Sequence, residues 1–398
     1  MSGLEDRLRD ALHASAGRVD ADKPRPFPER GPRRFPERGP RRGAPMRRWM
    51  VPVCAVLAVI ALAAGIVGVR KMMEPDRRLQ KVPTMPRFYF ASYLAGGGEP
   101  SRVEVRESRT GRLLDAKSAP KGTNFLDLAA AGDGRTLFLF ARQGGKGACA
   151  STIHRLSLND HGEITGDRRV PGGAVSGSPV GSGSLAVGAD GRRLAYSVES
   201  CTPEPETGKM SAGARIGVLD VASGARREWR ESQSAADQRL AWAGDGDRLF
   251  FVRSWYGSSD RTIHELRSLR VSGGAKQPTA GSLIRRITSP RAFEGVTASE
   301  DGRRVFVLEG SVGAVSAEAG AGAAPDSDGG FDVLELSAED GSVVRSIKRR
   351  SSFFAGDAIM KSDPSGRYLL TAYGLVDLGK PDGVSAFRVG EGFYDLDW

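Results

Sequence analysis

The chain has 398 residues, of which 39% are hydrophobic and only 7% aromatic, with 52 glycines and 22 prolines, and this composition favours short β-strands and tight turns over a helical bundle. Its net charge of +10 is concentrated near the N-terminus, because residues 1–49 hold thirteen Lys or Arg against seven Asp or Glu and residues 70–81 hold five against two. Residues 82–398 are nearly neutral, which argues against nucleic acid as a partner.

The first segment, residues 1–20, is predicted to be an amphipathic helix. Ser2 and Glu5 form a capping-box pattern, and an apolar stripe follows at a spacing of four residues, consisting of Leu4, Leu8, Leu12 and Ala16. Such a short helix is marginally stable alone. Residues 2–19 are therefore expected either to fray in solvent, to lie on the membrane or to dock on a cytoplasmic partner.

Residues 21–49 are predicted to be a disordered linker containing the tandem octapeptide FPERGPRR. Its Pro and Gly residues prevent a packed element, and its Arg pairs repel one another. Each Arg near an anionic leaflet would gain about 1 kcal/mol. We expect the linker to lie along the lipid bilayer.

Residues 50–69 read MVPVCAVLAVIALAAGIVGV and carry no charge, which predicts one transmembrane helix followed by a juxtamembrane linker at residues 70–84. The Lys and Arg residues that flank the span are balanced, so they do not orient it. The two cysteines beyond the span, Cys149 and Cys201, are compatible with a disulfide outside the cytoplasm. We therefore expect a single-pass cell-membrane protein with a cytoplasmic N-terminus and an extracellular C-terminal domain.

Residues 85–398 contain a recurring phrase, exemplified by SEDGRRVFVLEG at residues 299–310. The glycines of its turn recur at intervals of 57, 55, 56 and 64 residues, at Gly134, Gly191, Gly246, Gly302 and Gly366. A variable loop, a third strand, a second Gly turn and a fourth strand follow the phrase. Four antiparallel strands per repeat predict an all-β fold, a propeller whose blades stack around a common axis.

The number of blades follows from counting these phrases. Five full repeats and one N-terminal partial unit give six blades, or seven if residues 279–290 form a reduced blade. The partial unit lacks its first strand, and the C-terminal residues GFYDLDW resemble one. We expect Phe393, Tyr394 and Trp398 to close the ring.

The phrases GADGRRLAYSV and IGVLDVASGARREW resemble the S-P-D-G-R-x-L-A-[FY] signature of WD40-like propellers of the TolB and prolyl-oligopeptidase-cap type. The whole plan of tail helix, Arg/Pro linker, single span and propeller is similar to uncharacterised WD40-like membrane proteins of high-GC actinobacteria. This resemblance implies the fold but not the function.

Catalytic and metal-binding motifs are not evident in the sequence. His154 and His264 occupy the same place in two repeats, and neither a His-x-x-x-His nor a Cys-x-x-Cys pair occurs. A Gly-x-Ser-x-Gly elbow and a Walker A motif are also missing. The sequence therefore predicts neither an enzyme nor a cofactor or metal site.

The loops between second and third strands vary most and should emerge on one face of the ring. One of them offers aromatic and charged groups suited to a protein, peptide or glycan ligand, namely Arg253, Trp255, Tyr256, Asp260 and Arg261. Cys149 and Cys201 lie in this loop in successive repeats. We expect a disulfide between them.

Three functions fit these observations. The first is a membrane-anchored propeller that binds an extracytoplasmic ligand without catalysis. The second is a signalling regulator whose tail helix holds a cytoplasmic factor such as a sigma factor. The third is a propeller enzyme of lactonase or quinoprotein type, which needs inward-facing His or carboxylates on the innermost strands, and the segments LDLAAAG, RLAWAG and GVTASE show little of that.

Overall fold

The computed structural model describes residues 85–94, 100–144, 149–199, 214–230, 235–257, 261–311, 330–350, 360–363, 365–371, 374–379, 384–385 and 394–398. The predicted tail helix, linker and membrane span fall outside these ranges and stay predictions. Within the described ranges, no helix is long and apolar enough to cross a bilayer.

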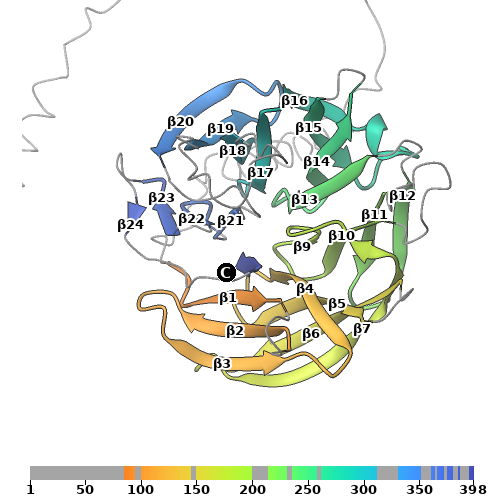
Figure 1. The fold of residues 1–398 in the computed structure, drawn as a ribbon, viewed down its shortest axis with the longest axis vertical. Helices are drawn as coiled ribbons and strands as arrows, with labels where there is room; N and C mark the ends of the chain where they lie inside the picture. Colours follow the sequence, from red (N-terminus) through yellow and green to blue (C-terminus); the bar gives the residue numbers. More distant parts are fainter. Residues whose placement is uncertain are drawn as a thin grey trace, which may run out of the picture. The chain divides into compact units, whose positions relative to one another are not determined.

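The described residues form six antiparallel sheets arranged around a centre, which makes the fold a six-bladed β-propeller (Figure 1). From the centre outward, the first three blades consist of β25 (Asp395–Asp397), β1 (Phe88–Tyr93), β2 (Arg102–Glu107) and β3 (Leu113–Ser118); β4 (Thr123–Ala130), β5 (Thr136–Gln143), β6 (Ala150–Leu158) and β7 (Ile164–Ser176); and β8 (Ser178–Pro179) with β9 (Leu185–Val187), then β10 (Arg193–Glu199), β11 (Arg215–Asp220) and β12 (Arg226–Arg230).

Blades 4 to 6 repeat the same order. They consist of β13 (Ala236–Trp242), β14 (Arg248–Tyr256), β15 (Thr262–Arg270) and β16 (Ser282–Thr288); β17 (Arg291–Ala298), β18 (Arg304–Ser311), β19 (Gly330–Ser337) and β20 (Val343–Arg350); and β21 (Met360–Ser362), β22 (Tyr368–Thr371), β23 (Gly374–Asp377) and β24 (Val384–Ser385). A 3₁₀ turn, η1 (Pro278–Ala280), precedes β16.

The recurring phrase forms the turn between the first and second strands of a blade. The five repeat glycines all have φ between +63° and +68°, a region that a residue with a Cβ enters only at a cost. The aspartate before the glycine holds the turn, since Asp245 Oδ1 accepts hydrogen bonds from the backbone N of Asp247 (2.9 Å) and Arg248 (3.0 Å). The structure thus confirms the predicted turn chemistry.

Arginines after the turn glycine join neighbouring blades. Arg193 Nη1 donates to Gly246 O of the next blade at 2.7 Å, and Arg248 Nη1 donates to Gly302 O of the blade after that at 3.3 Å. The Asp-Gly pair therefore forms the hairpin, and in blades 3 and 4 the arginine two residues after the glycine fastens it to the next hairpin.

The hydrophobic core lies between the blades. Phe138 and Phe140 of β5 pack with Leu194 and Tyr196 of β10, and the Phe140 and Tyr196 rings meet edge to face with centroids 6.3 Å apart. The second strand of a blade is covered on both faces, because each face packs against a neighbouring blade. This explains why segments such as TLFLFA are continuously apolar rather than alternating.

The seventh-blade alternative is wrong in the described part of the chain. Residues 282–288 form β16, the outermost strand of blade 4, which pairs along β15 from Ser268 to Ile263. The extra length before β16 is a connection containing η1 and adds no sheet.

The C-terminal segment lies against the first blade. β25 pairs antiparallel with β1, with Asp397 opposite Phe90 and Asp395 opposite Ser92, and Tyr394 N donates to Ser92 O at 2.6 Å. Leu396 is fully buried in a cluster formed by blade 1 and the neighbouring blade 6. Phe393 lies outside the described residues.

Candidate functional site

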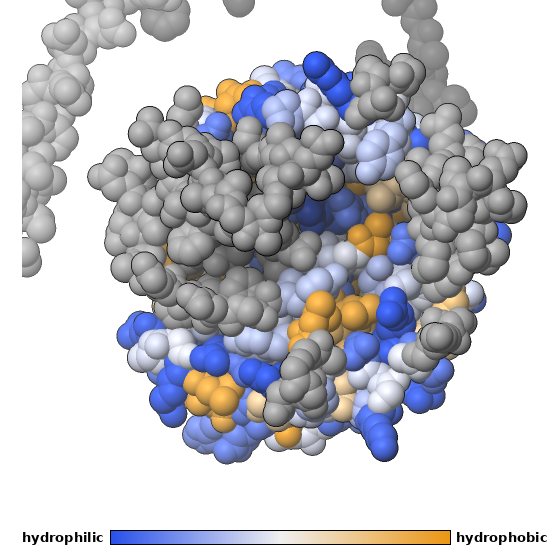
Figure 2. Space-filling model, in the orientation of Figure 1, coloured by the Kyte–Doolittle hydropathy of each residue, from blue (hydrophilic) through white to orange (hydrophobic). Residues whose placement is uncertain are grey.

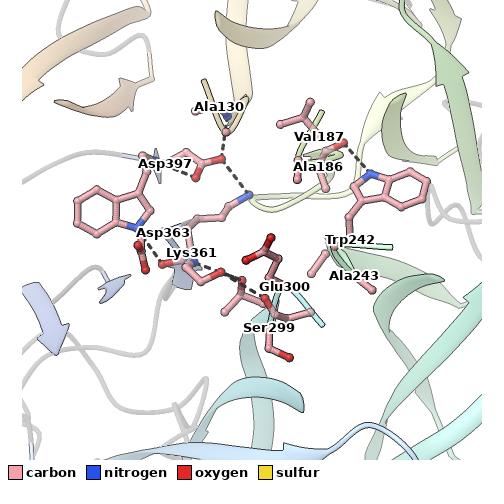
Figure 3. A pocket seen from close by; sticks show the side chains of 18 of the residues that line it. Ala130, Ala186, Val187, Trp242, Ala243, Ser299, Glu300, Lys361, Asp363 and Asp397 are labelled. Carbon is pink, nitrogen blue, oxygen red and sulfur yellow. Dashed lines mark hydrogen bonds and ion pairs between the residues drawn. The ribbon is translucent and has the colours of Figure 1, made fainter. Parts of the chain in front are cut away.

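The inner strands of all six blades enclose a pocket of about 140 Å³ at the centre of the ring (Figure 3). Small residues make up most of the wall, and two indoles and a few charged side chains complete it. The lining includes Ala130, Ala186, Ala241, Trp242, Thr297, Glu300, Lys361, Asp363, Asp397 and Trp398.

The pocket opens on the face of the tight turns, because its rim includes Gly132, Ala189 and Gly244, which precede the turn aspartates. The variable loops follow the second strands and so lie at the other end of the ring. The six contributing strands run clockwise in chain order in Figure 3 and counter-clockwise in Figure 1, so the two views look from opposite sides. The pocket thus lies opposite the loop face that the sequence favoured.

The loop face is itself hollowed near the centre, and hydrophilic side chains lie in the hollow (Figure 2). A cavity of about 10 Å³ deeper in the ring contains Arg239, Glu294 and Lys361, so Lys361 lies between this cavity and the pocket. Arg239 Nη2 donates to Glu294 Oε2 at 2.9 Å. The axis of the ring therefore carries charged residues at two levels.

Strand register shows how unusual the charged residues of the pocket are. The six inner strands share one register position. It holds a small residue in blades 2 to 5, a lysine in blade 6 and an aspartate in the adjacent blade 1. In blade order from 2 to 6 and then 1, these residues are Ala129, Ala186, Ala241, Thr297, Lys361 and Asp397. A side chain longer than alanine or threonine reaches the pore only at these last two positions. At this register position the charged side chains therefore lie on one side of the ring.

Lys361 extends across the pore. Its Nζ lies 3.8 Å from Asp397 Oδ2 of blade 1 and 3.5 Å from Leu185 O of blade 3, on the far side of the ring. Burial lowers the pKa of Lys361, but the carboxylates of Asp397, Asp395 and Asp127 outweigh burial and raise it above its ordinary value. Lys361 is therefore a charged ammonium rather than a free amine.

Two aspartates of β25 attach the chain end to the innermost strand of blade 2. Asp395 Oδ2 accepts from Leu128 N and Asp397 Oδ2 from Ala130 N, each at 2.9 Å. These two N–H groups face the pore, where β4 has no further strand to pair with. The carboxylates thus replace a missing strand partner.

Burial and neighbouring charge shift the pKa of the aspartates in this cluster. Burial raises the pKa of Asp397 to about 6, although the Lys361 ammonium and the Ala130 and Trp398 backbone N–H groups oppose the shift. Burial, then the Asp395 carboxylate, raises the pKa of Asp127 well above its ordinary value. Asp397 therefore changes charge near neutral pH.

The expectation that the innermost strands carry few carboxylates was wrong. Asp127 of β4 and Asp395 and Asp397 of β25 are buried there. Asp127 belongs to the segment LDLAAAG, whose alanines drew attention away from it. An alignment of the repeats would have found Lys361, because it replaces alanine or threonine.

The sequence-predicted ligand residues lie on blade 4, away from the pocket. Arg253 is buried, with its Nε 4.0 Å from Asp237 Oδ1 and its guanidinium over the Trp255 ring at 4.5 Å. Tyr256 is 78% exposed, and Arg261 is also exposed. Asp260 is outside the described residues, and a ligand-binding role for the set stays a prediction.

Of the two predicted disulfide cysteines, the structure describes only Cys149, which directly precedes β6 in blade 2. Cys149 O accepts from Gly177 N at 2.9 Å, and the next residue, Ser178, pairs with Glu199, two residues before Cys201. Cys201 itself is outside the described residues, so the disulfide stays a prediction.

The histidines of the third strands bind neighbouring strands. His154 Nδ1 lies 2.9 Å from Asp167 Oδ1, and His264 Nδ1 lies 2.8 Å from Ser254 Oγ. Burial and then the Arg239 charge lower the pKa of His264 to about 4, which makes it a poor base at neutral pH. Among the described residues, no three His, Cys, Asp or Glu side chains are grouped as a metal site.

No protein-family model and no curated protein matches the sequence. Solved structures do match: the periplasmic gluconolactonase of Pseudomonas aeruginosa is 16% identical, covering 78% of this chain and 98% of that chain with a TM-score of 0.43. Hydrazine synthase of Kuenenia stuttgartiensis is 14% identical over 71% of this chain and 72% of that chain, with a TM-score of 0.43. A prolyl endopeptidase is 15% identical over 61% and 33%, respectively, with a TM-score of 0.36.

At these TM-scores the likeness carries no argument about this chain. Its own sheets define the chain as a six-bladed β-propeller with a central pocket. Its predicted membership of the TolB-type WD40-like proteins stays a prediction.

Proposed function

We propose that this protein is a membrane-anchored β-propeller that binds a ligand outside the cytoplasm without converting it. The observation that carries this proposal is the central pocket, to which every blade contributes. The anchor and the orientation rest on the uncharged segment at residues 50–69 and on the cysteine pair, as the sequence suggests.

The chemistry of the pocket favours recognition over turnover. The raised pKa of Lys361 keeps its amine protonated, so it lacks the lone pair that a nucleophilic lysine needs. Both oxygens of Asp397 accept backbone N–H groups, from Ala130 and Trp398. These side chains hold the pocket in shape and present charge to a ligand.

One observation favours the enzyme alternative. Asp397 lies in the pocket, and its pKa of about 6 is suited to general base catalysis near neutral pH. A substrate bound beside it would lose a proton to Asp397 if its acidic hydrogen came within hydrogen-bond reach. The regulator alternative depends on residues 2–19 and stays a prediction.

The test combines a thermal-shift screen of the detergent-solubilised full chain with mass spectrometry of each compound that stabilises it. Binding predicts stabilisers that are recovered unchanged and that act less on Lys361→Gln. A stabiliser converted by the wild type but not by Asp397→Asn would establish the enzyme alternative instead.

Protease treatment of intact cells tests the location. Digestion of the propeller without lysis is the expected outcome, with an N-terminal tag at residue 1 protected. Protection of the propeller would reverse the proposed orientation.

A further inference from the structure

Most polar groups of the pocket are already used by the fold. Asp363 accepts from Tyr368 N at 2.7 Å and from Ser365 N at 3.0 Å, which fixes its turn. The Trp242 indole donates to Ala186 O and the Trp398 indole to Lys361 O, each at 3.3 Å. These groups shape the wall and leave little capacity for a ligand.

The hydroxyl groups of the wall are similarly engaged. Thr297 Oγ1 and Ser362 Oγ lie 2.7 Å apart and share a hydrogen bond. Asp397 uses both of its oxygens for backbone N–H groups, as described above.

Two charged groups of the pocket keep spare hydrogen-bonding capacity. The Lys361 ammonium has three donors but contacts acceptors only at 3.5 Å and 3.8 Å, which is longer than the usual range of about 2.7–3.2 Å. Glu300 is exposed on the rim, and its carboxylate has no hydrogen-bond or ion-pair partner among the described residues. Figure 3 shows both side chains directed into the pocket.

Glu300 departs from the repeat in the same way as Lys361. The residue before the turn aspartate is Gly132, Ala189 or Gly244 in blades 2 to 4, and Glu300 in blade 5. Lys361 follows in blade 6, where blades 2 to 5 carry alanine or threonine and blade 1 carries Asp397. Two neighbouring blades, 5 and 6, thus supply the pocket with opposite charges at positions where blades 2 to 4 carry none.

We propose that the pocket binds a small zwitterion of the α-amino-acid class, with its carboxylate at Lys361, its ammonium at Glu300 and an apolar side chain against the alanine and tryptophan wall. This inference names the ligand class for the pocket and so rests on the proposed binding function.

Charge selects a zwitterion over singly charged ligands. An anion reaching Lys361 would also meet the Asp397 carboxylate, 3.8 Å from the ammonium, and the Glu300 carboxylate on the rim, whereas the ammonium of a zwitterion offsets this repulsion at Glu300. A cation reaching the floor of the pocket would be repelled by Lys361 itself. A zwitterion adds no net charge and satisfies both unused groups.

Size limits the ligand to a single small molecule. The cavity of about 140 Å³ is well below the roughly 300 Å³ at which pockets for drug-sized ligands begin. The rim is closely packed, since a Cβ on Gly244 would lie 2.0 Å from Glu300 O and one on Gly132 would lie 2.9 Å from Ala189 O. The mouth is thus bounded by backbone that has no room to gain side chains.

The test is calorimetric titration of the detergent-solubilised full chain at pH 7 with three probes that share one side chain: valine, valinamide and N-acetylvaline. Valine is a zwitterion, valinamide a cation and N-acetylvaline an anion. We expect valine to bind at least about tenfold more tightly than either derivative, a difference of about 1.4 kcal/mol.

Two variants test which side chain contacts the ammonium and which contacts the carboxylate of the ligand. Glu300→Gln is expected to reduce the preference of valine over N-acetylvaline, and Lys361→Gln its preference over valinamide. Glu339→Gln is the matched control, because Glu339 is also an exposed glutamate of blade 5 but lies outside the pocket. Glu300→Gln alone suffices if Lys361→Gln fails to fold, because Glu300 is exposed.

Equal binding of the three probes, no saturable binding of valine, or equal effects of Glu300→Gln and Glu339→Gln would overturn the zwitterion inference. If the zwitterion inference fails but the thermal-shift screen yields stabilising compounds, the proposed binding function is still supported. A screen without any stabiliser would instead count against the binding function itself.

Discussion

Buried carboxylates occur in two regions of this propeller and behave in opposite ways. Around the pore, burial raises the pKa of Asp397 to about 6. In the third strands, burial also favours the neutral acid, but hydrogen bonds from Arg102 and Arg106 lower the pKa of Glu104. Both carboxyls are less than one-tenth exposed, so burial alone does not decide their charge.

The difference lies in the partners of each carboxylate. Glu104 receives two arginines, Arg102 Nε and Arg106 Nε, each at 2.8 Å. Asp127, Asp395 and Asp397 share one lysine, Lys361, whose Nζ lies 3.8 Å from Asp397 Oδ2. The third-strand carboxylate of Glu104 is therefore compensated by two arginines, whereas the three carboxyls of the pore cluster have one lysine between them.

The largest expected effect on stability comes from removing the C-terminal strand β25. Deleting residues 394–398 removes β25 and the buried Leu396, and exposes Tyr89 and Leu370 of the same cluster. We expect a loss of more than about 5 kcal/mol in the free energy of unfolding, measured by chemical denaturation. Full-length Leu396→Ala should lose only about 3 kcal/mol; a truncation no worse than this would mean that β25 contributes little to closure.

The next largest effect on stability is expected from neutralising one buried carboxylate in each region, Glu265 in a third strand and Asp127 near the pore. Glu265→Gln leaves Arg267 and Arg286 without the charge that they contact, so we expect about 3 kcal/mol of destabilisation. Asp127→Asn should change stability by less than about 1 kcal/mol, because an amide resembles the protonated acid that the raised pKa favours. Equal losses in urea unfolding would contradict the contrast between the two regions.

Two glycine substitutions compare the pocket rim, at Gly244, with the tip of the following turn, at Gly246. A Cβ on Gly244 would lie 2.0 Å from Glu300 O, so Gly244→Ala forces blades 4 and 5 apart and should cost about 3 kcal/mol. Gly246 has φ +66° and no atom within 4 Å of its Cβ position, so Gly246→Ala should cost only about 1 kcal/mol. The order of the two melting temperatures checks this prediction.

The smallest effect is the response to pH. The folded pKa of Asp397, about 6, exceeds its ordinary value of 3.8, so the folded state binds this proton more tightly and the contribution of this group to stability rises as pH falls from 7 to 5. The pKa of His264, lowered from 6.5 to about 4, acts in the opposite direction over the same range, so the Asp397 contribution is measured as a difference between variants. The gain from Asp397 is about 1.4 kcal/mol. The lowered pKa of Glu104 and of Glu265 acts in the opposite direction, and its contribution is lost only below about pH 4.3.

Denaturant titrations at pH 7 and pH 5 measure this response. Between pH 7 and pH 5, Asp397→Asn should lose the contribution of Asp397 relative to the wild type, whereas Glu104→Gln should follow the wild type. The same change in stability for the wild type and Asp397→Asn would show that Asp397 does not titrate between pH 5 and pH 7.

Much of the fold was predictable because propeller hairpins are local. Each Asp-Gly turn joins strands a few residues apart, and positive φ at Gly134 or Gly302 follows from neighbours in sequence. The blade count was less certain, because β16 follows an irregular connection that resembles the start of another repeat. The pocket was missed because Lys361 and Asp397 differ from the repeat by single substitutions that carry no periodic signal.

The sequence by itself determined the blades: turn residues at regular intervals, apolar strands between them and a last strand left over for the first blade. Only the tertiary structure decided the site. Ring closure brings Asp127, Lys361 and Asp397 together from three blades, although 270 residues separate the first from the last in the chain. Their shared burial sets their charges, and burial and charge coupling depend on distances in space that residue order does not contain.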